Sequence, residues 1–70
     1  MKVESMRWYR IVVDGVPHVV RVDGHIMKWC VVDYYDARLW CAGSLAQCKK
    51  FIVNHIPEGI YDEEGAYHGY

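Results

Sequence analysis

Residues 7–22, RWYRIVVDGVPHVVRV, decide the fold, because they predict two β-strands joined by a tight turn. The first seven residues of the stretch are mostly β-branched and aromatic, which favours a strand. Asp14-Gly15 follows, and its glycine accepts the positive φ that tight hairpin turns demand. The last six residues predict the second strand, with Pro17 near its start, where the missing N–H costs no ladder hydrogen bond.

The alternation of apolar runs and turn signals continues beyond this hairpin. Asp23-Gly24 repeats the turn signal and predicts a second tight turn. Residues 25–32 (HIMKWCVV) predict a third strand, residues 33–36 (DYYD) a loop and residues 37–42 (ARLWCA) a fourth strand. Because the connections between consecutive strands are short, the sequence predicts an antiparallel meander.

A helix is predicted after the fourth strand. Ser44 and Gln47 fit the capping-box pattern, in which the serine hydroxyl accepts from the amide of the third helical residue and the glutamine side chain reaches back. One helix face then recurs at spacings of three and four, through Leu45, Cys48, Ile52 and His55. Pro57 is expected to stop the helix near His55 or Ile56.

The sequence therefore predicts an α+β fold of order β-β-β-β-α, a four-stranded antiparallel meander with one helix packed on one face. Residues 1–56 form this single domain, and residues 57–70 form an acidic, tyrosine-rich C-terminal tail. A hydrophobic content of 53% supplies the dense core that a 70-residue chain needs. No apolar run approaches the ~18 residues of a membrane span and the N-terminus lacks a signal-peptide core, so we expect a cytoplasmic protein.

The three cysteines, Cys30, Cys41 and Cys48, do not have the spacing of a metal site. Zinc sites usually take closely spaced cysteine or histidine pairs, and the chain has no Cys-x-x-Cys and no comparable histidine pair. We expect reduced, buried thiols, since an odd number excludes a complete disulfide framework. A four-residue loop after the third strand would place Cys30 opposite Cys41, whereas a two-residue loop would place it opposite Leu39. We predict no cofactor.

Catalytic groups are not brought together by the predicted elements, so we predict a protein that is not an enzyme. A catalytic cysteine needs a base within hydrogen-bond reach. His25 and Cys30 are five residues apart on one predicted strand and point to opposite faces, while Cys48 and His55 lie two helical turns apart. The carboxylates of the DYYD loop are expected to stabilise its turn. No glycine-rich phosphate loop is present in the sequence.

Both faces of the predicted sheet are apolar, which indicates an interaction surface. One short helix covers one face only, and sizeable exposed apolar patches usually mark interaction sites. We therefore predict a protein partner, with two-fold homodimerisation as the alternative use of the same patch. The candidate partner-binding residues are Trp8, Trp29 and Trp40 on the strands and Tyr61, Asp62, Glu63, Glu64, Tyr67 and Tyr70 in the tail.

The tryptophans and the C-terminal tail predict where on the molecule a partner would dock. If Trp29 or Trp40 faces away from the helix, that indole is the strongest candidate for the docking point. Three tyrosines in the last ten residues supply large, rigid contact area. The tail either covers the open face of the sheet or docks its carboxylates and tyrosines on a basic partner.

A small single-stranded nucleic-acid-binding domain is the alternative function. Basic residues alternate with aromatic ones along the predicted strands, as on base-stacking sheets, at Arg7, Arg10, Arg21, Lys28 and Arg38. The charge balance argues against this reading. Residues 1–56 carry eight Lys/Arg and five Asp/Glu, residues 57–70 carry four Asp/Glu, and the net charge is −1.

From Trp29 to Ile52 the chain, WCVVD…RLWCAGSLAQCKKFI, resembles small orphan proteins of bacteriophages and prophages. These proteins often end a short meander with a Trp-containing strand, a small-residue and Ser/Thr cap, and one helix. The resemblance implies a counter-defence role of the anti-CRISPR kind, in which a compact phage protein inhibits a bacterial defence complex such as a CRISPR-Cas effector. It assigns no functional residue, since such proteins share no site motif.

Overall fold

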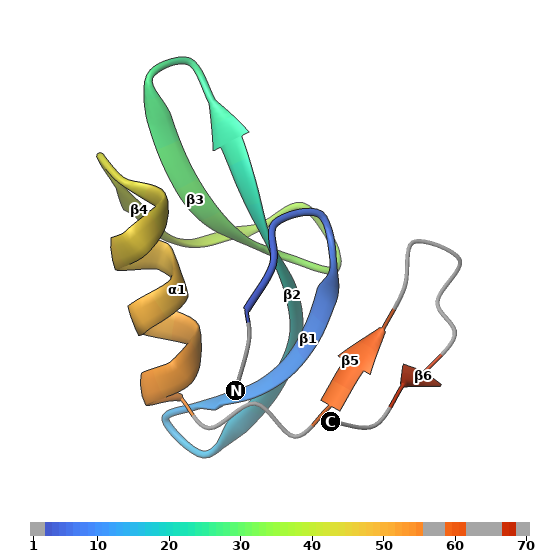
Figure 1. Cartoon of the computed structure of the whole chain (residues 1–70). Coiled ribbons are helices and arrows are strands. Elements are labelled where there is room, and N and C mark those ends of the chain that lie inside the picture. The colour runs from blue at the N-terminus through green and yellow to red at the C-terminus, as the bar shows by residue number, and fades with distance from the viewer. Residues whose placement is uncertain (1–2, 56–58, 62–66, 69–70) are drawn as a thin grey trace.

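The computed structural model describes residues 3–55, 59–61 and 67–68 of the chain. All its strands belong to one antiparallel sheet of order β4-β3-β2-β1-β5-β6 (Figure 1). The elements are β1 (Trp8–Val13), β2 (Val16–His25), β3 (Lys28–Asp33), β4 (Arg38–Ala42), α1 (Leu45–Asn54), β5 (Gly59–Tyr61) and β6 (Tyr67–His68).

The predicted fold class is confirmed, since four consecutive antiparallel strands are followed by one helix. The sheet also continues into the predicted tail, because β5 pairs with the free edge of β1 and β6 pairs with β5. In Figure 1 these two short strands extend the sheet on the side away from the helix. No helix in the part of the chain described here is long and apolar enough to cross a membrane.

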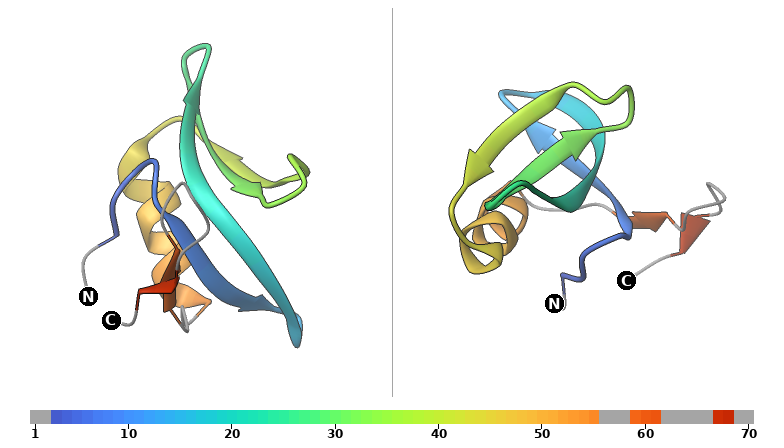
Figure 2. Two further views of the ribbon diagram at one scale, coloured as in Figure 1. Left: turned by 90° about the vertical axis from the view of Figure 1, so that its right-hand side faces the viewer. Right: turned by 90° about the horizontal axis from the view of Figure 1, so that it is seen from above.

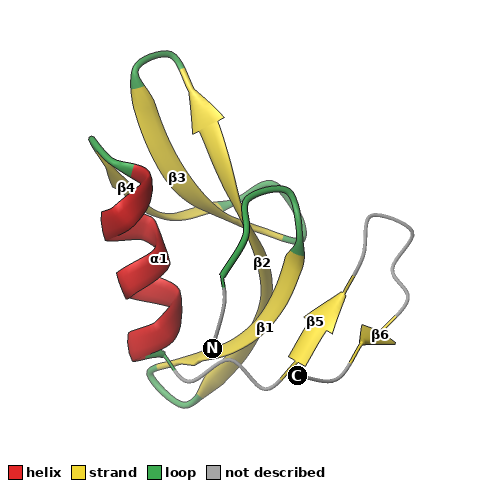
Figure 3. Cartoon of the chain, viewed as in Figure 1, coloured by secondary structure: helices red, strands yellow, loops and turns green. Residues whose placement is uncertain are grey.

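The two predicted tight turns have opposite outcomes. Asp14 and Gly15 form the β1–β2 turn with φ of 51° and 78°, as predicted. The predicted turn at Asp23-Gly24 is wrong, because both residues lie inside β2 and pair with β3. The chain instead reverses at residues 26–27, at the tip of a hairpin that projects past the end of the helix (Figure 3).

Burial explains why the second turn moved. The observed register places Val22 opposite Val31, and both side chains are fully buried. A turn three residues earlier would break this pair, so core packing outweighs the local turn preference. Gly24 serves another purpose, because a Cβ added there would lie 3.2 Å from the ring of Trp29. Because the turn lies at Ile26 and Met27 instead, these two residues adopt positive φ angles of 34° and 63°.

The prediction that the loop aspartates stabilise the turn between β3 and β4 is confirmed for the Asp33 carboxylate, whereas Asp36 bonds within the loop through its backbone amide. The Asp33 carboxylate accepts from the Tyr35 amide at 2.7 Å, and the Asp33 carbonyl accepts from the Asp36 amide at 2.9 Å. The loop spans residues 34–37, between the end of β3 and the start of β4. The pairing of Cys30 with Cys41 predicted for a four-residue loop is confirmed, and the alternative pairing with Leu39 is wrong. The β3–β4 register shifts between Val31 and Val32, because Val31 pairs with Trp40 and Val32 with Arg38.

The helix begins as predicted and ends at Asn54, one residue before His55, where the predicted stop ahead of Pro57 begins. The Ser44 hydroxyl accepts from the Gln47 amide at 3.3 Å, as the capping box requires. The Gln47 side chain departs from that pattern, since its carbonyl oxygen accepts from the Ser44 hydroxyl at 3.3 Å. At the other end, the His55 carbonyl accepts from the Val12 amide and ties the helix end to β1.

The core lies between α1 and the face of the sheet that the helix covers (Figure 2). Strand alternation directs Tyr9 and Ile11 to this face, and both are fully buried. The Tyr9 hydroxyl is not left without a partner, because it donates to the Glu4 carbonyl at 2.6 Å. The buried core residues are Val3, Tyr9, Ile11, Val20, Val22, Val31, Cys48 and Ile52.

Candidate functional site

The three tryptophans are divided between the two faces of the sheet. Trp29 and Trp40 pack against the core on the helix side, and the ring of Trp40 stacks on Phe51 of α1 at 5.2 Å. Trp8 alternates with buried Tyr9 and therefore lies on the opposite face, which we call the helix-distal face. Neither Trp29 nor Trp40 faces away from the helix, so the indole that meets this condition is that of Trp8.

Trp8 belongs to a cluster that we call the aromatic surface, made of Trp8, Arg21, Tyr34 and Tyr35. The Arg21 guanidinium carbon lies 5.1 Å from the Trp8 ring centroid, a cation–π distance. The Tyr34 ring lies 5.5 Å from the Trp8 ring and 5.1 Å from the Tyr35 ring. Tyr34 and Tyr35 are 57% and 84% exposed, so the cluster presents aromatic rings to solvent.

Local structure places each member of the aromatic surface. Trp8 and Arg21 are direct partners in the β1–β2 ladder, which brings the guanidinium over the indole. Tyr34 and Tyr35 follow β3 in the loop that Asp33 holds. The sequence predicted the loop but not its contact with Trp8, because the two are separated by more than twenty residues and meet only once the strands pair.

The register also places part of the predicted tail beside Trp8. Tyr61 of β5 takes the ladder position opposite Trp8, and Tyr67 of β6 takes the position opposite Tyr61. Three of the predicted partner-binding positions therefore lie in one row across the sheet. The side chains of these two tyrosines, and the predicted residues Asp62, Glu63, Glu64 and Tyr70, lie outside what the structure describes.

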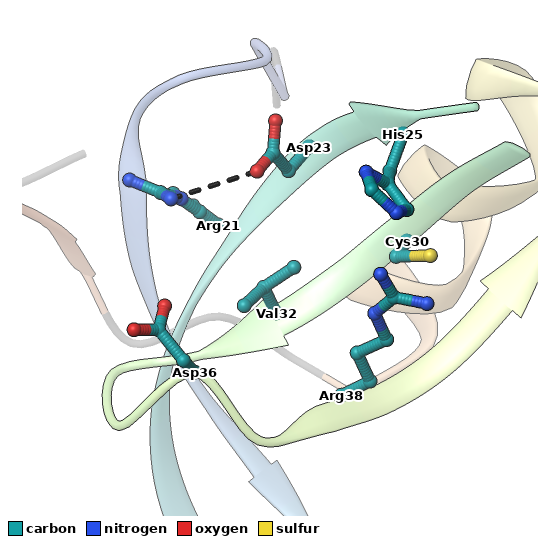
Figure 4. Close-up of a pocket in the computed structure, with 7 residues that line it drawn as sticks. All are labelled: Arg21, Asp23, His25, Cys30, Val32, Asp36 and Arg38. Atoms are coloured by element: carbon teal, nitrogen blue, oxygen red, sulfur yellow. Dashed lines mark ion pairs between the residues drawn. The ribbon is translucent and has the colours of Figure 1, made fainter.

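A shallow pocket of about 180 Å³ lies on the helix-distal face next to the aromatic surface (Figure 4). Arg21 pairs with Asp23 at 3.5 Å across one side of it, and its Nε is buried without a hydrogen bond among the described residues. The lining residues are Arg21, Asp23, His25, Cys30, Val32, Asp36 and Arg38. This pocket was not predicted, although Arg21, Asp23 and His25 alternate along one strand. The prediction that His25 and Cys30 lie on one strand and point to opposite faces is wrong, because they lie on β2 and β3 and line the same pocket.

The cysteines differ in burial. Cys30 and Cys48 are 1% and 0% exposed, as predicted, whereas the prediction of a buried thiol is wrong for Cys41, which is exposed. The Sγ atoms of Cys30 and Cys41 lie 2.6 Å apart across the β3–β4 ladder. The hydrogen bond with Cys41 raises the pKa of Cys30, burial raises it further, and Arg38 and Lys28 lower it.

A histidine and an aspartate contact each other on the helix side of the sheet. His18 Nδ1 lies 3.4 Å from an Asp33 carboxylate oxygen, and that aspartate already holds the loop after β3. Among residues 3–55, 59–61 and 67–68, no three His, Cys, Asp or Glu side chains are grouped so as to hold a metal ion.

Comparisons of the chain with protein-family models, with curated proteins and with solved structures gave no match.

Proposed function

We propose that the protein is a non-enzymatic protein-binding module that docks its partner on the aromatic surface. The observation that carries the proposal is the contiguous, solvent-facing group of Trp8, Arg21, Tyr34 and Tyr35. Tryptophan, tyrosine and arginine are the residue types that dominate binding energy at protein interfaces. Tyr35 is 84% exposed and absent from the core, so most of its ring is open to a partner in the isolated chain.

The partner that fits this surface presents a carboxylate. Arg21 Nε is buried and donates to no acceptor among the described residues, and leaving such a donor unsatisfied is costly. An incoming aspartate or glutamate would accept from it while the partner's apolar atoms cover the Trp8 ring. Arg38 also lines the pocket, where Asp23 and Asp36 balance the two positive charges, so the need for a carboxylate rests on Arg21 Nε.

The narrower proposal is that the partner belongs to a bacterial defence complex, such as a CRISPR-Cas effector, which the protein inhibits. Its support is the sequence resemblance between Trp29 and Ile52 to phage and prophage orphan proteins. A second copy of the chain is the other protein that could occupy the aromatic surface, and light scattering separates a homodimer from a monomer that binds another protein.

The test is affinity capture with three forms of the full-length chain. Tagged wild-type protein should retain a bacterial protein that the double variant Trp8→Ala/Tyr35→Ala loses. Met27→Ala is the matched control, because Met27 is 97% exposed on the β2–β3 turn, outside the aromatic surface, and should still retain it. Equal capture by all three forms, or a wild-type monomer that retains nothing, would contradict the proposal.

The defence-complex proposal needs its own readout. Phage plating efficiency on a host with an active CRISPR-Cas system should rise when the wild-type protein is expressed and stay low with the Trp8→Ala/Tyr35→Ala variant. An unchanged plating efficiency alongside a captured partner would remove the narrower proposal and leave the binding module intact.

A single-stranded nucleic-acid-binding domain is the second candidate. The observation that favours it is an arginine stacked over an indole on an open sheet face, since bases stack on such platforms. It requires affinity for a single-stranded oligonucleotide that falls steeply with salt and is lost in Trp8→Ala. No binding at low salt would remove this candidate.

A further inference from the structure

Cys30 and Cys41 have the geometry of a cross-strand disulfide. They are direct partners in the β3–β4 ladder, and their Sγ atoms lie 2.6 Å apart. Direct partners in an antiparallel pair have Cα atoms about 4.5–5.5 Å apart, inside the range of about 4.4–6.8 Å that disulfides span. A bond of about 2.05 Å therefore needs only a small approach of the two sulfurs and no change in the strands.

Access differs between the thiols. Cys41 is exposed on β4, which is an edge strand of the sheet, whereas Cys30 is 1% exposed on the floor of the pocket. Cys48 is fully buried on α1, against the opposite face of the sheet. A dissolved reagent therefore meets Cys41 first, with Cys30 in place to react second.

We propose that Cys30 and Cys41 form a reversible dithiol–disulfide site that is oxidised by low-molecular-weight disulfides of the oxidised-glutathione type. The Cys41 thiolate attacks one sulfur of the reagent, the reagent's S–S bond breaks, and one small thiolate leaves with the bonding electrons. The Cys30 thiolate then attacks Cys41 Sγ and displaces the second small thiolate. The two leaving thiolates take up the two protons that the cysteines released, so one small disulfide becomes two small thiols.

The surroundings of Cys30 favour the second step once the first has occurred. The hydrogen bond with Cys41 is the largest cause that raises the pKa of Cys30, and it ends when Cys41 enters a mixed disulfide. Burial, which also raises the pKa of Cys30, remains, as do Arg38 and Lys28, which lower it. In Figure 4 the Arg38 guanidinium extends across the pocket toward Cys30, beside His25. The mixed disulfide on Cys41 is therefore expected to be short-lived.

The experiment treats reduced full-length protein with oxidised glutathione at neutral pH. The protein is then denatured in guanidinium chloride containing N-ethylmaleimide, so that the buried Cys48 is also blocked, and its intact mass is measured. Of the three cysteines, one should be blocked, and the peptide map should join Cys30 to Cys41. Cys48→Ser should form the same disulfide with no thiol left to block. Cys30→Ser should instead accumulate a glutathione adduct on Cys41, because the second thiol is missing.

Three outcomes would overturn the proposal: wild-type protein that keeps three free thiols, a disulfide that includes Cys48 or joins two chains, or a glutathione adduct as persistent as in Cys30→Ser. The wild-type measurement alone decides the first two outcomes, so the proposal stays testable even if Cys30→Ser fails to fold. The proposal uses neither Trp8 nor a partner, so it stands or falls independently of the proposed function.

Discussion

Both faces of the sheet carry tryptophan, but its neighbours differ. On the helix side Trp40 stacks on Phe51 and packs against the core. On the helix-distal face Trp8 contacts Arg21 and an exposed tyrosine. On the helix side the tryptophan rings pack against other residues of the chain. On the helix-distal face aromatic rings and a guanidinium are at least partly exposed and can contact another molecule. One residue type thus stabilises the fold on one face and is available for binding on the other.

Removing core volume on the helix side should give the largest effect. Ile52 is fully buried, so Ile52→Ala should lower the free energy of unfolding by about 2–5 kcal/mol through lost burial and a residual cavity. Val53, the next residue on α1, is 47% exposed, and Val53→Ala should cost less than about 0.5 kcal/mol. Urea denaturation followed by tryptophan fluorescence measures both, and equal losses would contradict the assignment of the core.

Closing the disulfide on the helix-distal face should stabilise the fold by about 2–3 kcal/mol, because it restricts the unfolded chain between Cys30 and Cys41. For a chain of this size each kcal/mol shifts the melting temperature by about 4–8 °C. Thermal unfolding of oxidised and reduced protein measures the difference, and Cys30→Ser should show none. An equal melting temperature for oxidised and reduced protein would contradict the expected restriction of the unfolded chain by the disulfide.

Exchanging one aromatic residue for leucine on each side should separate folding from binding. Trp40→Leu loses the stack on Phe51 and should cost about 1–2 kcal/mol of stability. Tyr35→Leu should stay within about 0.5 kcal/mol, since that side chain is 84% exposed, yet it should weaken partner capture. Thermal unfolding by circular dichroism and the capture experiment give the two readouts; the reverse pattern would exchange the roles of the two faces.

Alkaline pH should weaken the fold through groups on the helix side. Burial raises the pKa of Tyr9 and of Cys48 above their unfolded values. Groups that stay neutral longer in the folded state contribute their full stability below the unfolded pKa and lose it as the pH rises through the folded pKa. Stability should therefore be flat near neutral pH and fall above about pH 8.5, the ordinary pKa of cysteine.

Denaturation at a series of pH values measures this fall. In Cys48→Ala the free energy of unfolding should fall less steeply with pH than in wild type, when each protein is compared with its own value at neutral pH. Cys30 contributes to the same fall, because its hydrogen bond with Cys41 raises its pKa. Cys41→Ala removes that hydrogen bond and Cys30→Ala removes the titrating thiol, so the two variants are measured together. An identical slope in wild type and Cys48→Ala would show that the buried thiol does not couple to folding.

Several features of the fold were predictable because they depend on neighbours in sequence. Asp14-Gly15 makes its turn through its own backbone preference, and Ser44 caps the helix through a bond to the amide three residues on. The strands and helix followed from apolar spacing in the same way. The candidate site was predictable only in part, since Trp8 was among the expected docking residues while Arg21, Tyr34 and Tyr35 were not.

The sequence alone determined the order of the first five elements, β1 to α1, the first hairpin and the helix start, since local hydrogen bonds and side-chain spacing suffice for these. Only the tertiary structure decided that the second turn lies at Ile26 and Met27, that Trp8 rather than Trp29 or Trp40 faces away from the helix, and that the chain returns to extend the edge of β1. The physical reason is register. Shifting a strand by one residue reverses both of its faces, and the choice rests on burial against residues far away in the chain.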